Sequence, residues 1–276
     1  MLYLKDALAG GEPLFGTFST SGSPVMVETI GHAGMDFVVL DCEHAAVSPY
    51  GGEIAGLIRA AWSAGVPPIV RVTWNDPGQI LKALDMGASA VVVPHVNTAE
   101  EAAAAVSAAH HHPIGRRSAT PAVMGSKQGL TDWPRHYGRS QRETVVIPLI
   151  EEQQGVENIE EIAAVPNIGG IFFGPFDLAV SKGAGGDARD ADVAAERARV
   201  YAAAAARRLP VLDLAWDPEA ALALFRQGAD AVAVNVDVTI FASSIRDLAA
   251  GCTDAKRRLR AARRRAAARS RNGRGG

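Results

Sequence analysis

Two acidic residues follow two short apolar segments near the middle of the chain. Glu151 comes directly after Val145–Ile150, and Asp177 comes four residues after Ile171–Phe173. An unbroken apolar segment of this length is typical of a strand buried on both faces. If two such strands are neighbours, both carboxylates lie at one edge of the sheet, where Mg²⁺ or Mn²⁺ would find oxygen ligands. Each acid could instead cap the helix that follows it, and Glu152 is an adjacent alternative ligand.

Further polar side chains stand where other apolar segments end. Asp41, Glu43 and His44 follow the segment at residues 37–40, and Arg71 lies near the end of another. A guanidinium is permanently charged and suits a carboxylate or an enolate oxygen, although an ion pair with Asp41 or Glu43 would also explain Arg71. An imidazole titrates near neutral pH, so His44 is a candidate acid or base, with an ordinary hydrogen-bonded histidine as the alternative.

Other motifs are less specific. The turn at residues 174–176 could present main-chain N–H groups to an anion, or it could be a plain tight turn. Three consecutive histidines at 110–112 do not converge on one point, so they make a poor metal site. Lys82 and Lys182 fall in a predicted helix and a predicted loop, and no lysine stands at a strand end. This placement argues against an imine mechanism and for a metal-dependent one.

Strand-like and helix-like segments alternate along the chain, and this order would position the polar residues. Strands are predicted at residues 14–19, 37–40, 68–72, 88–93, 145–150, 170–173, 210–214 and 231–234. Helices are predicted at residues 4–9, 23–32, 50–64, 75–86, 98–110, 156–164, 189–208, 218–227 and 238–250. Eight strand–helix units in about 250 residues favour a (β/α)₈ TIM barrel over an open doubly wound sheet. The polar residues named above then stand at the carboxyl ends of strands, where barrels place their working side chains.

One segment interrupts the alternation. Residues 111–144 are rich in Pro, Gly and Ser and show little periodicity. A loop of this length in a compact domain is usually functional or mobile. We therefore expect it to be an excursion over the mouth of the sheet.

The charge distribution divides the chain into two parts. From Gly251 onward there are ten Lys or Arg and one acid, whereas the chain as a whole has a net charge of −2. We therefore predict a barrel domain at 1–252 and a basic, partly disordered tail at 253–276. The tail could bind nucleic acid or another polyanion. A fraying helix extension is favoured over nucleic-acid binding, because no aromatic residues stand among the arginines.

The remaining composition is that of a cytoplasmic protein. The chain has two cysteines, Cys42 and Cys252, with neither a disulfide framework nor zinc-ligand spacing. No apolar segment approaches the roughly 18 residues that a membrane span needs. The first residues show no export signal. We expect a cytoplasmic location and no membrane partner.

Several segments together resemble the HpcH/HpaI aldolase family of metal-dependent, class II pyruvate aldolases. This family includes 2,4-dihydroxyhept-2-ene-1,7-dioate aldolase-like enzymes and relatives of the citrate lyase β type. The matching segments are FVVLDCEHA (37–45), PPIVRVTWND (67–76), ALDMGASAVVVPHVNTAEEA (83–102), PLIEEQQGVENIEEIAAVPNIGGIFFGPFDLAVSKG (148–183) and GADAVAVNVD (228–237). The resemblance implies a barrel of the phosphoenolpyruvate/pyruvate-domain type. It also implies a divalent metal, Mg²⁺ or Mn²⁺ first and Co²⁺ or Zn²⁺ as alternatives.

The resemblance also implies roles for individual residues. Glu151 and Asp177 fall on the two metal ligands. Arg71 falls on the arginine that holds pyruvate and its enolate. His44 falls on the acid/base histidine, and Asp41 on the acid that helps hold the site.

Two further positions extend the implied site. The loop of Gly174, Pro175 and Phe176 matches the one that receives the pyruvate carboxylate. Asp85 matches an aspartate that reaches a histidine of a neighbouring subunit. The family's enzymes are typically homo-oligomers, namely hexamers built as trimers of dimers, which often exchange the C-terminal helix.

Two positions depart from the family pattern. Leu149 stands where many sugar-acid aldolases carry a substrate-binding Gln, and Cys42 stands where Gly is frequent. The expected activity is formation or cleavage of a 4-hydroxy-2-oxo acid from an aldehyde and a pyruvate enolate, with pyruvate or oxaloacetate as the 2-oxo acid. The alternatives are an oxaloacetate-type decarboxylase, an acyl-CoA lyase, and a non-catalytic barrel that binds a polyanion through its tail.

Overall fold

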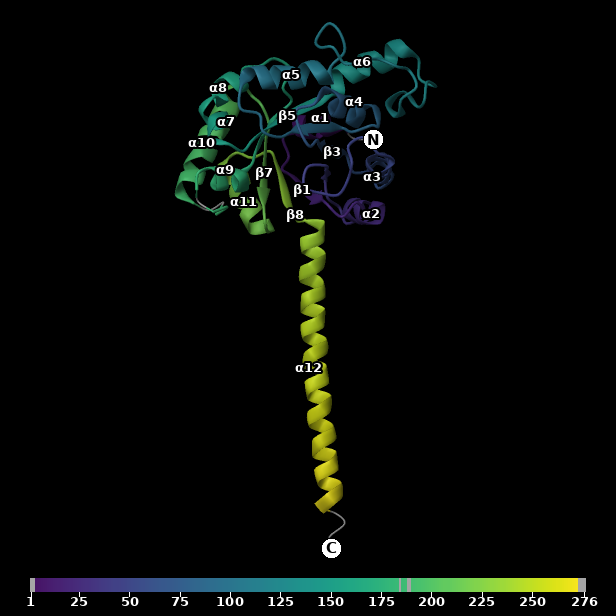
Figure 1. Ribbon diagram of the computed structural model, residues 1–276, viewed down its shortest axis with the longest axis vertical. Coiled ribbons are helices and arrows are strands. Elements are labelled where there is room, and N and C mark those ends of the chain that lie inside the picture. Colours follow the sequence, from purple (N-terminus) through teal and green to yellow (C-terminus); the bar gives the residue numbers. More distant parts are fainter. Residues whose placement is uncertain (1–2, 184, 188–189, 273–276) are drawn as a thin grey trace. The chain divides into compact units, whose positions relative to one another are not determined.

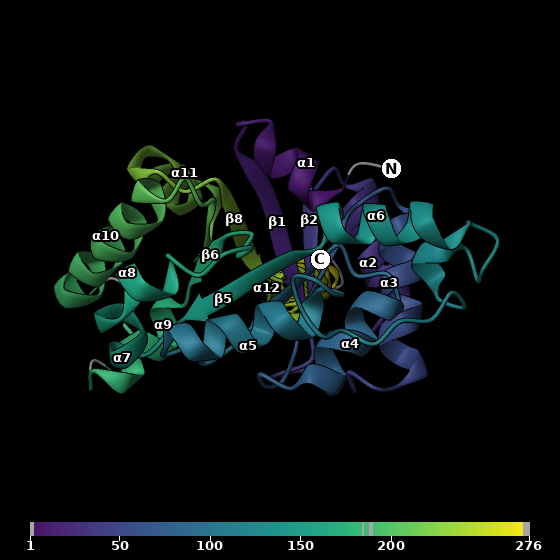
Figure 2. The ribbon, with the colours of Figure 1, turned by 90° about the horizontal axis from the view of Figure 1, so that it is seen from above.

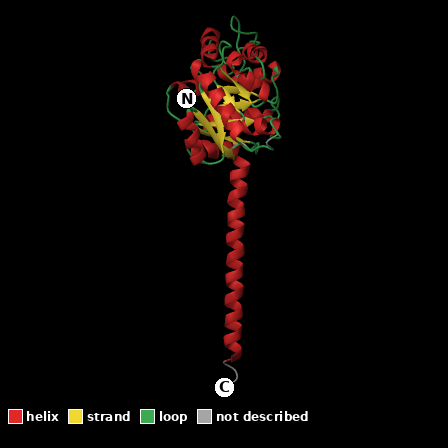
Figure 3. Ribbon diagram, turned by 90° about the vertical axis from the view of Figure 1, so that its left-hand side faces the viewer, coloured by secondary structure: helices red, strands yellow, loops and turns green. Residues whose placement is uncertain are grey.

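The protein is a closed barrel of eight parallel strands, as the sequence predicts. The computed structural model describes residues 3–183, 185–187 and 190–272. Neighbouring strands pair in chain order, and β8 closes the ring on β1. Helices surround the strands (Figures 1 and 2), and Figure 3 shows the sheet enclosed by them. The strands are β1 (Leu14–Ser19), β2 (Phe37–Asp41), β3 (Pro68–Arg71), β4 (Ala90–Val93), β5 (Val145–Ile150), β6 (Ile171–Phe173), β7 (Val211–Ala215) and β8 (Ala231–Val236).

The predicted helices are present with shifts at their ends, and α6 and α9 are helices that the sequence analysis did not predict. They are α1 (Leu4–Ala9), α2 (Pro24–His32), α3 (Gly52–Ser63), α4 (Pro77–Asp85), α5 (Ala99–Ala109), α6 (Trp133–Glu143), α7 (Gln153–Glu157), α8 (Ile159–Ile162), α9 (Pro175–Ser181), α10 (Ala191–Ala206), α11 (Pro218–Gln227) and α12 (Asp237–Asn272), with a 3₁₀ turn η1 (Met124–Ser126). Ser23, Asp76 and Thr98 cap their helices through side-chain oxygens, and Glu101 completes a capping box with Thr98. The single helix predicted at residues 156–164 is instead the short pair α7 and α8.

The core has two layers because successive strand residues point to opposite faces of the sheet. Val39, Ile69 and Ile147 belong to the layer inside the barrel, whereas Val38 and Val70 belong to the layer between sheet and helices. The inner layer also contains Leu4 and Leu8 of α1. Helix α1 therefore packs its apolar face onto the interior residues and closes one end of the barrel.

The predicted location of residues 111–144 over the mouth of the sheet is wrong. In a strand–helix unit the helix runs back along the strand, so the connection from α5 to β5 lies at the amino ends of the strands. The contacts agree with this placement. Arg117 pairs with Asp85 at the end of α4, and the main-chain oxygen of Arg142 accepts a hydrogen bond from Lys5 of α1. The segment is also partly helical, because it contains η1 and α6.

The C-terminal helix is longer than the sequence predicts. Helix α12 does not end at Ala250 but continues to Asn272, through residues that we predicted to be a partly disordered tail. Alanine, arginine and lysine dominate this stretch, and they are among the strongest helix formers. Two compact units divide after Asp237, whereas we placed the domain boundary at residue 252. The last four residues of the predicted tail, 273–276, lie outside the described residues.

Among the described residues, no helix combines the length and the apolar character that crossing a membrane requires.

The close approach of β1 and β2 yields a first prediction. A Cβ atom on Gly16 would stand 2.4 Å from the ring of the buried Phe37, so Gly16→Ala should force core side chains to shift. We expect a loss of about 1–3 kcal/mol in the free energy of unfolding, measured by urea denaturation. The control is Gly56→Ala in α3, where a Cβ meets nothing within 4 Å. It should gain about 1 kcal/mol, because alanine favours helix over glycine. Equal effects from the two substitutions would contradict the packing argument.

Candidate active site and metal centre

A buried ion pair joins the ends of β2 and β3. Asp41 and Arg71 are register partners on the two strands, and both side chains are buried. The Arg71 guanidinium donates from Nε and Nη2 to the two carboxylate oxygens of Asp41, at 2.9 and 2.8 Å. It also lies over the Phe18 ring, 5.1 Å from the centroid. Such a two-pronged geometry fixes both the position and the orientation of the guanidinium.

Glu43 extends this pair toward the middle of the site. Its Oε2 lies 3.0 Å from Nη1 of Arg71, and its Oε1 lies 3.1 Å from Nε2 of His95. The main-chain N–H of Glu43 donates to Oδ1 of Asp41 at 2.9 Å, which holds the turn after β2 in place. Burial lowers the pKa of Arg71, but the bond to Asp41 and the charges of Asp41, Glu43 and Glu151 outweigh it and raise that pKa overall. Arg71 is therefore a permanent cation among acids.

Glu151 is almost fully enclosed, with 2% of its surface exposed. Its Oε1 accepts a hydrogen bond from the main-chain N–H of His95 at 2.8 Å. Burial, together with the charges of Glu43 and Asp177, raises the pKa of Glu151 to about 7, although the hydrogen bond and charge of His95 oppose this rise. Gly174 leaves room for this side chain, because a Cβ there would stand 2.5 Å from the Cβ of Glu151.

His95 is the functional residue that the sequence reasoning missed. Its Nδ1 lies 2.8 Å from Oε1 of Glu152 and 3.5 Å from Oε1 of Glu151, while Nε2 faces Glu43. Burial lowers the pKa of His95, but the charges of these three acids and the bond to Glu152 raise it overall. Its φ of 55° is in the left-handed region, which costs a residue with a Cβ about 1–3 kcal/mol. The signal was the position itself, since His95 follows β4 and Pro94 at a strand end.

Three of these residues form a group that fits a divalent cation. Glu43, His95 and Glu151 each offer a ligand atom, and the three atoms lie within 4.8 Å of one another. Two carboxylates and one imidazole are an ordinary donor set for such an ion. We predicted Glu151 and Asp177 as the ligands, and the group shares Glu151 with that pair. Asp177 lies half-buried in the first turn of α9, and its charge acts on Glu151, so it stays a predicted ligand.

The other predicted residues stand at different distances from this group. His44 exposes 64% of its side chain, and its Nε2 lies 4.0 Å from Glu43. Leu149 is buried in the inner core, with Cδ1 close to Gly174. Gly174 caps α9, which begins at Pro175, and Phe176 is exposed. The structure thus brings Leu149 and the 174–176 loop beside Glu151 and leaves His44 at the rim.

Two predicted positions lie outside the cluster. Asp85 ends α4 and pairs with Arg117 at 2.7 Å, in the part of the chain that packs near α1 rather than near Glu151. Its predicted contact with a neighbouring subunit stays a prediction. Cys42 is buried in the layer that faces the helices, and burial together with the Asp41 charge raises its thiol pKa to about 12. It therefore contributes packing rather than a reactive thiol.

Comparison with known proteins identifies the family of this chain. The family model described as HpcH/HpaI aldolase/citrate lyase matches residues 14–244. The chain is 36% identical to 5-keto-4-deoxy-D-glucarate aldolase of Salmonella paratyphi A, over 89% of this chain and 94% of that protein. A family protein from Burkholderia cenocepacia J2315 superposes with a TM-score of 0.85 at 32% identity, covering 91% and 98% of the two chains. The citrate synthase SbnG superposes with a TM-score of 0.82 at 31% identity, covering 94% and 99%. The chain belongs to the HpcH/HpaI aldolase/citrate lyase family.

Proposed function

We propose that this protein is a metal-dependent carbon–carbon lyase that forms or cleaves a 4-hydroxy-2-oxo acid through a pyruvate enolate. The observation that carries the proposal is that Glu43 links Arg71 to the candidate metal ligands His95 and Glu151. Glu43 contacts the guanidinium on one side and His95 on the other, at 3.0 and 3.1 Å. A fixed cation beside a set of metal ligands is what an oxyanion that develops during bond cleavage requires.

The proposed metal is Mg²⁺ or Mn²⁺, and Glu151 belongs to both candidate ligand sets. If Asp177 and Glu43 complete the set, every protein ligand is an oxygen, which suits Mg²⁺. If His95 binds the metal, the imidazole favours Mn²⁺, Co²⁺ or Zn²⁺. When bound, the ion would polarise the keto oxygen of the 2-oxo acid and neutralise charge that develops there.

The chain's own residues would carry the other parts of the reaction. Arg71 would stabilise the enolate oxygen, and Asp41 would keep its guanidinium aimed by the two bonds described above. The main-chain N–H of Phe176, at the start of α9, would receive the substrate carboxylate, because the N–H of Gly174 already donates to the main-chain oxygen of Ile150 and Pro175 has none. His44 would move the proton between the substrate hydroxyl and solvent, since its exposed ring can exchange with water.

The relatives support the reaction class and leave its second substrate open. One is named for cleavage of a sugar-acid derivative and another for citrate synthesis, so the family's names cover both directions of carbon–carbon bond chemistry. Leu149 replaces a polar substrate contact with an apolar one beside Gly174. We therefore propose an acceptor aldehyde that is less polar near the 2-oxo group than the sugar acids.

We also propose a homo-oligomer, because α12 exposes large apolar side chains, among them Phe241, Ile245 and Leu248.

The enolate step can be measured without knowing the acceptor. In D₂O with pyruvate and Mg²⁺ or Mn²⁺, we expect the methyl proton signal of pyruvate to disappear by metal-dependent exchange. Glu151→Gln should slow this exchange by at least about 100-fold, because it removes a ligand carboxylate. Glu160→Gln on the exposed face of α8 is the control and should exchange normally. If Mg²⁺, Mn²⁺, Co²⁺ and Zn²⁺ all fail to support exchange, the proposed function is refuted.

The pKa of Glu151 predicts how metal binding depends on pH. Its carboxyl must lose a proton to bind a cation, so we expect the apparent Mg²⁺ affinity to fall by about tenfold per unit below pH 7. Without metal, ionising this buried acid costs stability as pH rises from about 4.5 to about 7. Added Mg²⁺ should therefore raise the melting temperature more at pH 8 than at pH 6. In the Glu151→Gln variant, added Mg²⁺ should raise the melting temperature only slightly, and by the same amount at pH 6 and at pH 8. A wild-type response independent of pH would contradict Glu151 as a ligand.

The two histidines can be distinguished by paired substitutions. His44→Gln should lower exchange by about 100-fold or more while leaving Mn²⁺ affinity unchanged, because it removes a proton carrier at the rim. His95→Gln should weaken Mn²⁺ binding, as measured by calorimetry, because it removes one member of the ligand group. If exchange instead survives in His44→Gln and fails in His95→Gln with metal still bound, the proton carrier is His95.

A further inference from the structure

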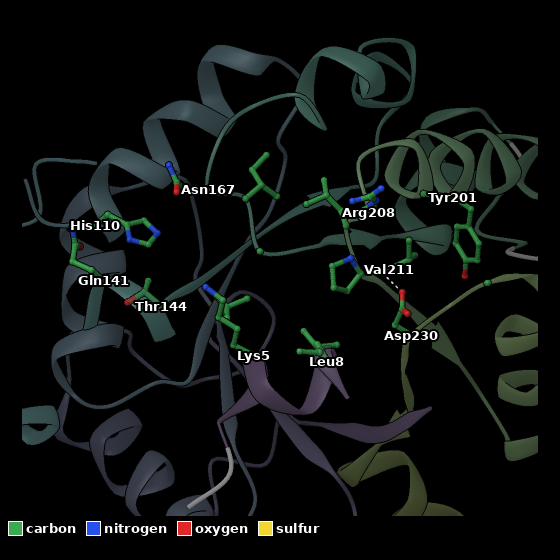
Figure 4. A pocket seen from close by; sticks show the side chains of 18 residues that line it. Lys5, Leu8, His110, Gln141, Thr144, Asn167, Tyr201, Arg208, Val211 and Asp230 are labelled. Carbon is green, nitrogen blue, oxygen red and sulfur yellow. Dashed lines mark hydrogen bonds between the residues drawn. The ribbon is translucent and has the colours of Figure 1, made fainter. Parts of the chain in front are cut away.

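A second cavity lies at the amino ends of the strands, on the side of the barrel away from Glu151. It has a volume of about 580 Å³ and is lined by residues from α1, from the ends of α5 and α10, and from the starts of β5 and β7. Figure 4 shows His110, Gln141 and Thr144 on one side, Arg208, Tyr201 and Asp230 on the other, and Lys5 between them. Strand β5 begins at this cavity with Val145 and ends before Glu151. Six residues of strand at about 3.3 Å each separate the cavity from the metal group by about 20 Å.

A buried histidine faces this cavity without a hydrogen bond. His110 is 3% exposed, and neither ring nitrogen has a hydrogen-bond partner in the described part of the chain. The nearby amide of Gln141 uses its oxygen and nitrogen on the main chain of His111, at 3.0 and 3.1 Å. Buried polar atoms nearly always have hydrogen-bond partners. The His110 ring therefore has one donor and one acceptor nitrogen that a ligand could bind.

Two cations also line this cavity. Lys5 and Arg208 are exposed, and neither forms an ion pair within the part of the chain that the structure describes, although Asp230 lines the same cavity. Lys5 donates to the main-chain oxygen of Arg142, and Oδ2 of Asp230 accepts from the main-chain N–H of Val211. Lys5, Arg208 and Asp230 together give the cavity a net positive charge.

The backbone at Arg208 supports a role for its side chain. Arg208 follows the end of α10 with φ 56°, a left-handed position where helices usually place glycine. Glycine would relieve this conformational cost, whereas arginine retains it and places a guanidinium at the cavity. The same conformation makes the position convenient to test.

We propose that this cavity is a second ligand site, which binds a small hydroxylated anion such as a hydroxy acid or a polyol phosphate. Lys5 and Arg208 would hold the anionic group by charge-assisted hydrogen bonds. The free oxygen of Asp230 would accept from a ligand hydroxyl, and the neutral ring of His110 would donate to or accept from another. The site needs no metal and is separate from the proposed lyase activity.

The probes are D-gluconate and glycerol 3-phosphate, which test the carboxylate and phosphate forms of the ligand. Binding is followed by NMR of the histidine ring signals, in Mg²⁺ and again in EDTA, with His110→Gln used to assign the His110 signal. We expect at least one probe to shift that signal saturably under both conditions. Burial, together with the charges of Arg117, Lys5 and His111, lowers the pKa of His110 to about 4, although the Gln141 side chain opposes this shift. A bound anion should raise that pKa. Glycerol, which lacks charge, should shift nothing.

Paired arginine substitutions then test the site itself. Arg208→Gly keeps the left-handed turn and should weaken binding of the active probe by about tenfold or more, with an unchanged or higher melting temperature. Arg207→Gln removes the same charge one residue earlier, outside the cavity lining, and should leave the affinity unchanged. The proposal is overturned if neither probe binds saturably at millimolar concentration. It is also overturned if the two substitutions have equal effects.

Discussion

The buried pair of Asp41 and Arg71 is the interaction on which the candidate active site depends. It links β2 to β3 at the carboxyl end of the barrel, and it turns one face of the guanidinium toward Glu43. Removing one partner of such a buried pair typically costs about 3–5 kcal/mol, because the other charge is left without compensation. Asp41 also accepts the main-chain N–H groups of Glu43 and His44, so the same carboxylate shapes the turn that carries both residues. The Asp41 carboxylate therefore stabilises both the junction of β2 with β3 and the positions of the active-site side chains.

The second constraint is an excess of negative charge. Glu43, Glu151 and Glu152 all lie within 3.5 Å of one imidazole, and Asp177 adds its field to that of Glu43 at Glu151. Carboxylates this close repel one another, so a nearby positive charge stabilises the cluster. The His95 ring lies among the three acids, on a residue with a left-handed backbone. A divalent cation would supply more positive charge at the same place, with His95 as one of its candidate ligands.

The sequence predicted the barrel because its signals are local. Each strand is a short apolar segment, and caps such as Ser23, Asp76 and Thr98 mark where helices begin. The same reasoning placed Glu151, Arg71 and Asp41 at strand ends, which the structure brings together. It missed His95 because its role comes from acids more than 50 residues away along the chain. No local sequence pattern predicts such a contact. The left-handed turn at His95 also lacks the glycine that would have indicated a turn of this kind.

Two other differences have separate causes. The position of residues 111–144 followed from chain direction alone, since a helix-to-strand connection in a barrel lies at the amino end. Composition was a poor guide there, because Pro and Gly indicate a loop but not the end of the barrel on which it lies. Helix α12 differs from the prediction in its length. We favoured a helix extension that frays into partial disorder, whereas the alanines between the arginines favour helix as far as Asn272.

The barrel separates two kinds of polar site by a packed interior. Phe18, Leu149 and Phe172 fill the space beneath the carboxyl-end cluster, while Leu4 and Leu8 close the amino end. The cavity is also bordered by Tyr201, whose hydroxyl begins a buried polar chain through Asp213 to Arg197, which lies over the Phe173 ring of β6. Energetic effects of substitutions that are far apart and share no partners usually add. Coupling between the two ends would therefore need an element that borders both, and the strand β5 and this polar chain beside β6 are the two that the structure offers.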